Sequence, residues 1–142
     1  MKSKVLAQRL GWHNYHGNPG DSDAHFFAQR EAGFHAWLNV ESPYIVATAA
    51  IGTGIDVPGI THVIHLEAPH SIIDYAQEAG RAGMSGERVV AMVVIEDKDW
   101  PEEVAAKDSC LELKRREVNG LILTKGCRRS ILGRCLDSDL GT

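Results

Sequence analysis

Residues 44–66 read YIVATAAIGTGIDVPGITHVIHL, and this stretch decides the fold class of the chain. Tyr44–Ala49 is rich in β-branched residues and follows a proline, so it predicts a buried strand. A glycine-rich loop leads to Thr61–Leu66, which predicts a second strand. Ser71, with Asp74 three residues later, then predicts the capped start of a helix.

Downstream of that helix, Val89–Ile95 predicts a third apolar strand. Strands that alternate with helices predict parallel βαβ units that are covered on both faces. Glu102–Glu117 and Lys125–Leu136 predict two further helices outside the sheet. The expected fold class is therefore α/β with a mainly parallel sheet, followed by a small helical tail.

Upstream, residues 2–10 predict a helix and His13–His16 a short strand, which leads into a Gly-Asn-Pro-Gly turn. Asp21 or Ser22 can cap a second helix that runs to about Asn39. The aromatic residues of that helix recur at helical spacing, which is typical of a core rather than of a platform for stacking bases.

Composition excludes several classes of protein. At 142 residues and 44% hydrophobic content, the chain fits one soluble globular domain, or one domain with a tail. The longest apolar stretch has the size of a strand and the first residues lack a signal-peptide core, so we expect no membrane partner. The three cysteines form no even framework, which favours a reducing compartment.

The net charge of −4 conceals an asymmetry between two segments. Leu111–Cys135 holds seven Lys or Arg against two Glu, whereas Glu87–Asp108 holds seven acidic residues against three basic ones. A basic segment beside an acidic loop can bind nucleic acid. A solvated helix face is the simpler interpretation, and composition alone favours it.

The chain lacks the motifs by which a protein binds and hydrolyses ATP alone. It has no G-x-x-x-x-G-K-[ST] sequence, and GTGIDVPG does not have dinucleotide-binding spacing. No strand is followed by a pair of acidic residues for Mg²⁺. No nucleophile–base pair or G-x-S-x-G turn is present either, so an unrelated small α/β enzyme and a small-molecule metabolite are disfavoured.

The loop after Tyr44–Ala49 leaves the carboxyl end of a strand, where ligands of open α/β sheets collect. Gly54 permits close approach of the backbone, and Asp56 can accept a hydrogen bond from a ribose hydroxyl. Thr48 can donate its hydroxyl to a nucleic-acid phosphate. For this loop alone, a tight glycine turn capped by Asp56 is a slightly better interpretation.

Residues 77–86, QEAGRAGMSG, are more informative. Gln77, Arg81 and Met84 are spaced i, i+4 and i+7, so one helix face is expected to present all three. Gly80 and Gly83 keep that face shallow, and an Arg beside a Gln suits contact with a γ-phosphate across an interface. By itself, this segment is more simply interpreted as a surface Arg near a helix-ending glycine. Because the glycine-rich loop and a strand precede it, contact with a γ-phosphate becomes the favoured interpretation.

The sequence ATAAIGTGIDVPGITHVIH, followed by DYAQEAGRAG, resembles motifs V and VI of RecQ-type helicases of superfamily two, and it is most similar to the fungal group. RLGWHNYHGNPG resembles the segment after motif IV, so the resemblance covers roughly Leu6–Val94. It implies that residues 1–97 form a partial RecA-like three-layer αβα lobe that lacks its first strand. Residues 98–142 are then an acidic linker and a basic helical tail that resembles the start of a zinc-binding region.

The resemblance implies the second lobe of an ATP-dependent DNA helicase that moves 3′ to 5′, with DNA and the first RecA-like lobe as partners. ATP with Mg²⁺ is then bound mainly by the first lobe, and zinc only by a longer form. The expected location is the nucleus, or the cytoplasm in a bacterium. The implied roles are catalysis for Gln77 and Arg81, nucleotide binding for Gly54, Asp56, Gly80 and Arg81, nucleic-acid contact for Thr48, His16, Arg128 and Arg129, and metal binding for Cys127.

Three departures from the family pattern limit the resemblance, and one is that the first lobe, with its phosphate-binding loop and Mg²⁺-binding acids, is absent. Met84 stands where the family pattern G-R-x-G-R has its second Arg, the expected arginine finger, and Met supplies no charge. Loss of such a finger typically lowers turnover by about 10³–10⁵. Cys127 and Cys135 give an incomplete zinc site, because four ligands are needed. We therefore expect an inactive isolated chain. The alternative is a non-catalytic remnant that binds nucleic acid or protein through its basic tail (Lys114, Arg115, Arg116, Arg128 and Arg129).

Overall fold

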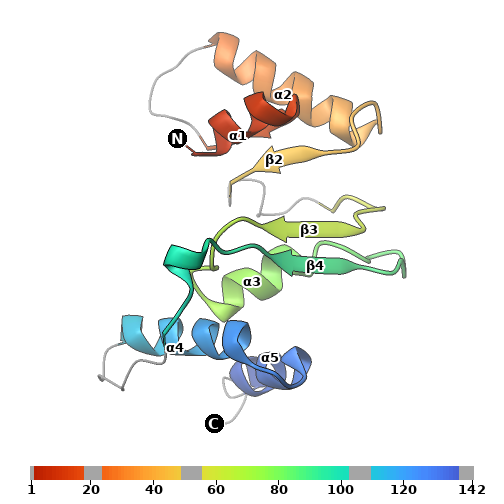
Figure 1. The fold of residues 1–142 in the computed structure, drawn as a ribbon. Helices are drawn as coiled ribbons and strands as arrows, with labels where there is room; N and C mark the ends of the chain where they lie inside the picture. The colour runs from red at the N-terminus through yellow and green to blue at the C-terminus, as the bar shows by residue number, and fades with distance from the viewer. Residues whose placement is uncertain (1, 18–23, 49–55, 103–109, 138–142) are drawn as a thin grey trace. The chain divides into compact units, whose positions relative to one another are not determined.

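The computed structural model describes residues 2–17, 24–48, 56–102 and 110–137 (Figure 1). Contacts divide the chain into two compact units, Met1–Val57 and Pro58–Thr142, called unit 1 and unit 2 below. Each unit contains one pair of parallel strands with a helix between them in sequence. The domain boundary expected between residues 97 and 98 stays a prediction.

Unit 1 pairs two short strands in parallel, with His13 opposite Ile45 and Tyr15 opposite Ala47. Its elements follow the predicted order, although each strand is shorter than expected: α1 (Lys2–Leu10), β1 (His13–Tyr15), α2 (Ala24–Leu38) and β2 (Ile45–Ala47). Gly54, together with the predicted caps Asp21 and Ser22, lies outside the described residues.

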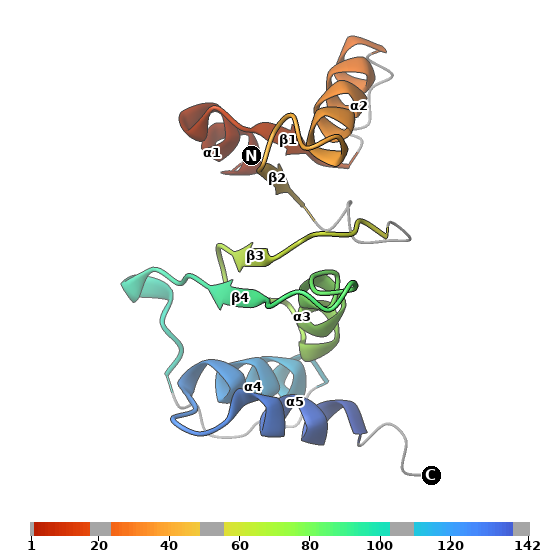
Figure 2. The same cartoon turned by 90° about the vertical axis from the view of Figure 1, so that its right-hand side faces the viewer.

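The helices α1 and α2 lie on opposite sides of the strand pair (Figure 2). On one side the ring of Tyr15 meets Phe34 of α2, with 5.3 Å between ring centroids. A Cβ atom on Gly33 would lie 2.9 Å from His13 Nδ1, so glycine lets α2 approach β1 closely. On the other side Ala7 of α1 and Val46 of β2 are buried.

The chain leaves α2 through Val40, which has a φ of 61°. A β-branched residue in this left-handed region is strained, because its Cβ crowds the following carbonyl. Val40 is also 80% exposed, so burial of its side chain does not offset that strain.

Unit 2 also pairs its strands in parallel, with Ile64 opposite Met92. Its elements are β3 (His62–His65), α3 (Ile72–Ala79), β4 (Val90–Val93), the 3₁₀ turn η2 (Asp97–Asp99), α4 (Cys110–Leu123) and α5 (Arg128–Asp137). The three helices pack against one another on one side of the strands (Figure 1).

Most of the buried apolar side chains belong to unit 2. Ile72 and Tyr75 of α3 meet Val118, Leu121 and Ile122 of α4 in one cluster. Half-buried side chains of β4, its flanking residue and α5 pack around this cluster (Val93, Ile95, Ile131, Leu132, Cys135 and Leu136). The basic helical tail therefore contributes to the core of unit 2.

The predicted end of the first tail helix was wrong. The helix was expected to end at Glu117, but α4 continues to Leu123. Val118, Leu121 and Ile122 are buried against α3, and this burial outweighs the low helix propensity of Gly120 between them. The expected helical start at residue 102 is also wrong, since residue 102 is not helical, and residues 103–109 are outside the described part.

The fold class is confirmed as α/β with short parallel strand pairs and helices, as expected for a partial RecA-like lobe followed by helices. Within the described ranges the strands form two separate two-stranded sheets. Among the same residues, no helix combines the length and the apolar character that crossing a membrane requires.

Candidate nucleotide and nucleic-acid contacts

Helix α3 begins with the predicted cap. Ser71 Oγ accepts a hydrogen bond from the backbone N–H of Asp74 at 3.1 Å and donates one to Asp74 Oδ2 at 2.9 Å. These bonds satisfy a backbone group that the first helical turn leaves open. Ile72 and Tyr75 face the core, while Gln77 is exposed. The helix is thus fixed with Gln77 toward solvent.

The structure corrects the expectation that one helix face presents Gln77, Arg81 and Met84. The helix ends at Ala79, and Gly80 is its C-cap, with its N–H donating to the carbonyls of Ala76 and Glu78. Arg81 is half-buried and Met84 is 55% exposed in the turn beyond the helix. Their orientation therefore depends on that turn.

The turn has a glycine where its geometry requires one. Gly83 has a φ of 78°, and its N–H donates to the carbonyl of Ile60 at 3.1 Å. A Cβ atom at Gly83 would lie 2.6 Å from Val89 Cγ2, which is too close for any other residue. The hydrogen bond to Ile60 also ties the turn to the segment before β3.

The carboxylate of Glu87 closes the same turn. The backbone N–H of Ser85 donates to Glu87 Oε2 at 3.1 Å. Hydrogen bonds from the backbone N–H groups of Glu87 itself, Ser85 and Gly59 hold the pKa of Glu87 below its ordinary value. The carboxylate therefore stays ionised and keeps the turn closed at neutral pH.

A side-chain bond joins α3 to β3. His65 Nε2 lies 2.7 Å from Glu78 Oε2, and the side chains are 11% and 32% exposed. The His65 ring also lies 5.2 Å from the Tyr75 ring. Glu78 lies in the last turn of α3, so this bond fixes the end of the helix against β3. The sequence pattern gave no signal for this pair, because it joins residues on different elements.

Three other expected site residues, Asp56, Thr48 and His16, lie in unit 1. Asp56 and Thr48 are exposed, and the N–H of Thr48 continues the strand ladder by donating to the carbonyl of Tyr15 at 3.0 Å. Their side chains are therefore open to solvent. Because Asp56 is in unit 1 and Arg81 in unit 2, the shared rim expected for them stays a prediction.

His16 is only 7% exposed. Its Nδ1 lies 2.9 Å from the carbonyl of Gly17, and its ring centroid lies 4.6 Å from that of Phe26. The expected nucleic-acid contact by His16 stays a prediction.

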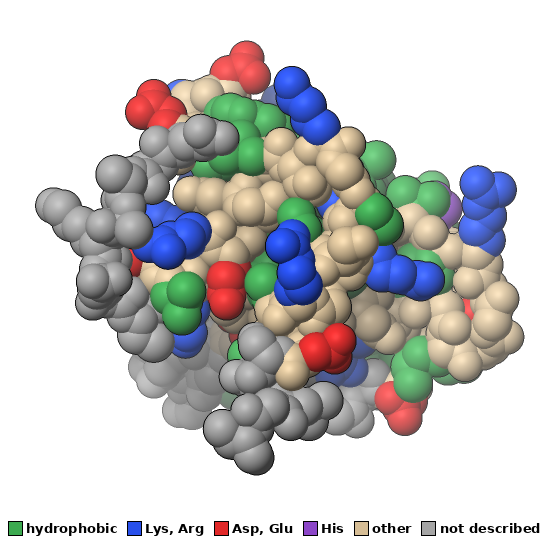
Figure 3. All heavy atoms as spheres, turned by 90° about the horizontal axis from the view of Figure 1, so that it is seen from below, with side chains coloured by type: hydrophobic (Ala, Val, Ile, Leu, Met, Phe, Trp, Pro, Cys, Tyr) green, Lys and Arg blue, Asp and Glu red, His purple; other side chains and the backbone are tan. Residues whose placement is uncertain are grey.

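The expected residues of the tail lie around the connection from α4 to α5. Arg128 Nε donates to the carbonyl of Leu121 at 3.2 Å, which satisfies one of the carbonyls at the end of α4. Arg128 and Arg129 are nevertheless exposed. Figure 3 shows Lys and Arg side chains standing apart from one another over the face seen from below.

Cys127 is exposed and immediately precedes α5. Hydrogen bonds from the backbone N–H groups of Ser130 and Arg129 hold the pKa of Cys127 below its ordinary value. Cys135 is half-buried, and desolvation raises its pKa. The two thiols therefore differ in chemistry. Within the described ranges, no three His, Cys, Asp or Glu side chains are grouped to hold a metal ion.

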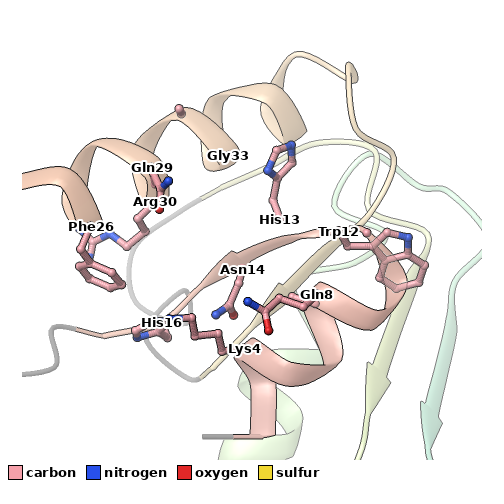
Figure 4. A pocket seen from close by; sticks show the side chains of 13 residues that line it. Lys4, Gln8, Trp12, His13, Asn14, His16, Phe26, Gln29, Arg30 and Gly33 are labelled. Atoms are coloured by element: carbon pink, nitrogen blue, oxygen red, sulfur yellow. The ribbon is translucent and has the colours of Figure 1, made fainter.

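One feature of unit 1 was not expected from the sequence. The elements α1, β1 and α2 enclose a hollow of about 550 Å³ (Figure 4). Its lining comes from three separate elements, so no local motif marks it.

Comparison with known proteins places these features in a family. Residues 24–86 match the helicase conserved C-terminal domain family. ATP-dependent helicase wrn-1 of Caenorhabditis elegans is 34% identical over an alignment of 127 residues, and the match covers 78% of this chain and 12% of that protein. RecQ-like DNA helicase BLM of Xenopus laevis is 40% identical over 74 residues, 51% of this chain and 5% of that protein. ATP-dependent RNA helicase ddx23 of Dictyostelium discoideum is 38% identical over 71 residues, 50% of this chain and 8% of that protein.

The fold and these matches define the C-terminal, second RecA-like lobe of a superfamily-two helicase. The chain belongs to the RecQ type within that superfamily. It spans between 5% and 12% of the length of the relatives described above.

Proposed function

We propose that this chain contributes the second lobe's contacts to ATP and DNA in an ATP-dependent helicase that moves 3′ to 5′. ATP with Mg²⁺ is held mainly by the first RecA-like lobe, which is the protein partner. Gln77 and Arg81 reach toward the phosphates, and Gly80 lets them approach. Gly54 and Asp56 contact the nucleotide, and Thr48, His16, Arg128 and Arg129 contact the DNA strand.

The turn of residues 80–88 supports this proposal most directly. It is held by the Gly83–Ile60 hydrogen bond and by the carboxylate of Glu87, so Arg81 starts from a defined backbone. A fixed backbone favours catalysis, because an arginine that stabilises a transition state must already be in place.

The proposal predicts how hydrolysis divides between the lobes. The chain alone should show no DNA-stimulated ATP hydrolysis, because it lacks a phosphate-binding loop. Mixing it with a separately produced first lobe of a RecQ-type helicase should give weak hydrolysis that Arg81→Gln abolishes. Hydrolysis by the chain alone, or a mixture that is insensitive to Arg81→Gln, would contradict the proposal.

The basic tail favours a second candidate function, binding of nucleic acid or protein without catalysis. Lys114, Arg115, Arg116, Arg128 and Arg129 are all exposed. Binding through them should weaken as salt rises, because phosphate contacts release counterions. Charge reversal at Arg115 and Arg129 should abolish low-salt binding of single-stranded DNA. Unchanged binding would exclude the tail as the binding surface.

Two further expectations accompany the helicase assignment. A longer form of the protein binds zinc with Cys127 as one ligand, which metal analysis of that form can test by comparing it with Cys127→Ser. In a eukaryotic cell the protein is nuclear, which microscopy of a tagged chain can test.

A further inference from the structure

The hollow in unit 1 has the dimensions of a small-molecule site. Its volume of about 550 Å³ falls within the range of roughly 300–1,000 Å³ that is common for ligand pockets. Because α1 and α2 lie on opposite sides of the strands, the hollow follows the edge of β1 that does not pair with β2 (Figure 4). The proposed function uses His16 of its lining and gives the other lining residues no role.

The charges in the lining have one sign. Lys4 of α1 and Arg30 of α2 are cations, and Arg30 also pairs with Glu31 at 3.1 Å. The thirteen lining residues include no Asp or Glu. Lys and Arg give strong, charge-assisted hydrogen bonds to phosphate oxygens, so the hollow favours an anion.

Carboxamide groups enter the lining from all three elements. Gln8 comes from α1, Asn14 from β1 and Gln29 from α2 (Figure 4). A carboxamide both donates and accepts hydrogen bonds, which matches the mixed donors and acceptors on the edge of a nucleobase. Asn14 Oδ1 is buried and takes no hydrogen bond from the described residues, a cost that a ligand donor would relieve.

Aromatic rings stand at both ends of the lining. His16 and Phe26 lie together at one end, with 4.6 Å between ring centroids. Trp12 lies at the other end, where it stacks on Tyr44 at 4.5 Å. Aromatic faces bind bases by stacking whatever the base is.

We propose that this hollow binds a nucleotide, with its phosphate at Lys4 and Arg30 and its base against the carboxamides and aromatic rings. The same chemistry is offered by a free mononucleotide and by a nucleotide within a strand. Of the residues that the proposed function uses, His16 lies in this lining, whereas Thr48, Asp56 and Arg81 do not.

The test uses the isotope-labelled 142-residue chain and follows side-chain amide resonances by NMR during titration. AMP should shift the signals of Gln8, Asn14 and Gln29 to saturation, and adenosine should bind more weakly because it lacks the phosphate. Unshifted amide signals at millimolar AMP would overturn the proposal. So would stronger binding of an acidic peptide than of AMP, because that result would assign the edge of β1 to a protein partner.

A charge-matched pair of variants locates the phosphate. Lys4→Gln should weaken AMP binding about tenfold, the typical effect of losing one charge-assisted hydrogen bond. Arg9→Gln removes one positive charge from the same helix outside the lining and should leave affinity unchanged. Equal losses of AMP affinity in the two variants would mean that AMP is attracted only by the general positive charge of the helix, and this result would overturn the proposed site.

Two further measurements identify the source of the nucleotide and separate the sites. An oligothymidylate whose binding also depends on Lys4 would identify a nucleic-acid strand, whereas AMP binding alone would identify a free nucleotide; both results support the proposal. Arg81→Gln should leave AMP binding in the hollow unchanged. A loss of binding in Arg81→Gln would place AMP at Arg81 and overturn the proposal.

Discussion

Units 1 and 2 are built on the same plan, a parallel strand pair joined through a helix, yet they bury different amounts of apolar surface. In unit 2 the tail helices complete a cluster around Ile72, which is 1% exposed. In unit 1 the buried apolar side chains of the described residues are Ala7 and Val46. The two units therefore share a topology but differ in packing. The difference comes from the helices that cover the strands, because unit 2 has the additional tail helices α4 and α5.

This difference in packing matches a difference in the kind of site. Unit 2 has a turn held by hydrogen bonds beside a filled core, which suits an arginine that must be positioned in advance. Unit 1 leaves space along one edge of its strand pair, which suits a ligand that must enter and leave. Five predictions test this comparison, in order of decreasing effect.

Restoring charge at Met84 should have the largest effect. In the mixture with a first lobe, Met84→Arg should raise ATP hydrolysis by about 10³-fold or more, because an arginine finger stabilises the charge of the transition state. Steady-state phosphate release measures this rise. Met84→Gln is the control, since it offers hydrogen bonds without a charge. No rise with Met84→Arg would mean that this position does not face the γ-phosphate.

The contribution of the tail to unit 2 can be measured within one helix. Leu121→Ala should lower the free energy of unfolding by about 2–5 kcal/mol, because Leu121 is 3% exposed in the core. Leu113→Ala should change it by less than about 0.5 kcal/mol, because Leu113 is 52% exposed. Urea denaturation followed by circular dichroism distinguishes the two. Equal effects would show that the tail is not part of the core.

The Gly83 turn can be tested against a second glycine. Gly83→Ala should lower the free energy of unfolding by about 1–3 kcal/mol, because it combines a left-handed φ with a collision against Val89. Gly86→Ala shares the positive φ, but its Cβ would meet nothing within 4 Å, so about 1 kcal/mol is expected. Thermal denaturation of both variants gives the difference. A smaller loss at Gly83 would contradict the packing of this turn.

In unit 1, relief of strain at Val40 should stabilise the protein. Val40→Gly should raise the free energy of unfolding by about 0.5–1 kcal/mol, since glycine adopts φ of 61° without a steric cost. Asn39→Gly is the control at a neighbour without a positive φ, and it should lower stability slightly. Urea denaturation checks both. A loss of stability in Val40→Gly would show that the backbone at Val40 is not strained.

The smallest effect concerns Cys127 and Cys135, two of the three thiols of unit 2. Alkylation by iodoacetamide should proceed faster at Cys127 than at Cys135 at neutral pH, because backbone hydrogen bonds lower the pKa of Cys127 and desolvation raises that of Cys135. As pH rises, the rate at Cys127 should therefore reach its plateau first. Mass spectrometry after timed quenching measures both sites. The reverse order would contradict the hydrogen bonds at the start of α5.

Several local features could be predicted from the sequence, because they depend on neighbours in the chain. The Ser71–Asp74 cap and the helix from residue 72 follow from patterns within a few residues. The parallel pairing follows from the alternation of strands and helices along the chain. The length of α4 could not be predicted in this way. Its last turn forms because Leu121 and Ile122 find α3, a contact between segments about 50 residues apart in sequence.

The features of the candidate site also divide into those that the local sequence predicts and those that depend on tertiary contacts. The motif glycines and Arg81 are evident from spacing alone, because each has a local chemical role. The His65–Glu78 bond was decided by tertiary structure, because it depends on how α3 packs against β3. The hollow in unit 1 is likewise set by three elements that meet, and side chains from separate elements leave no periodic signal in a sequence.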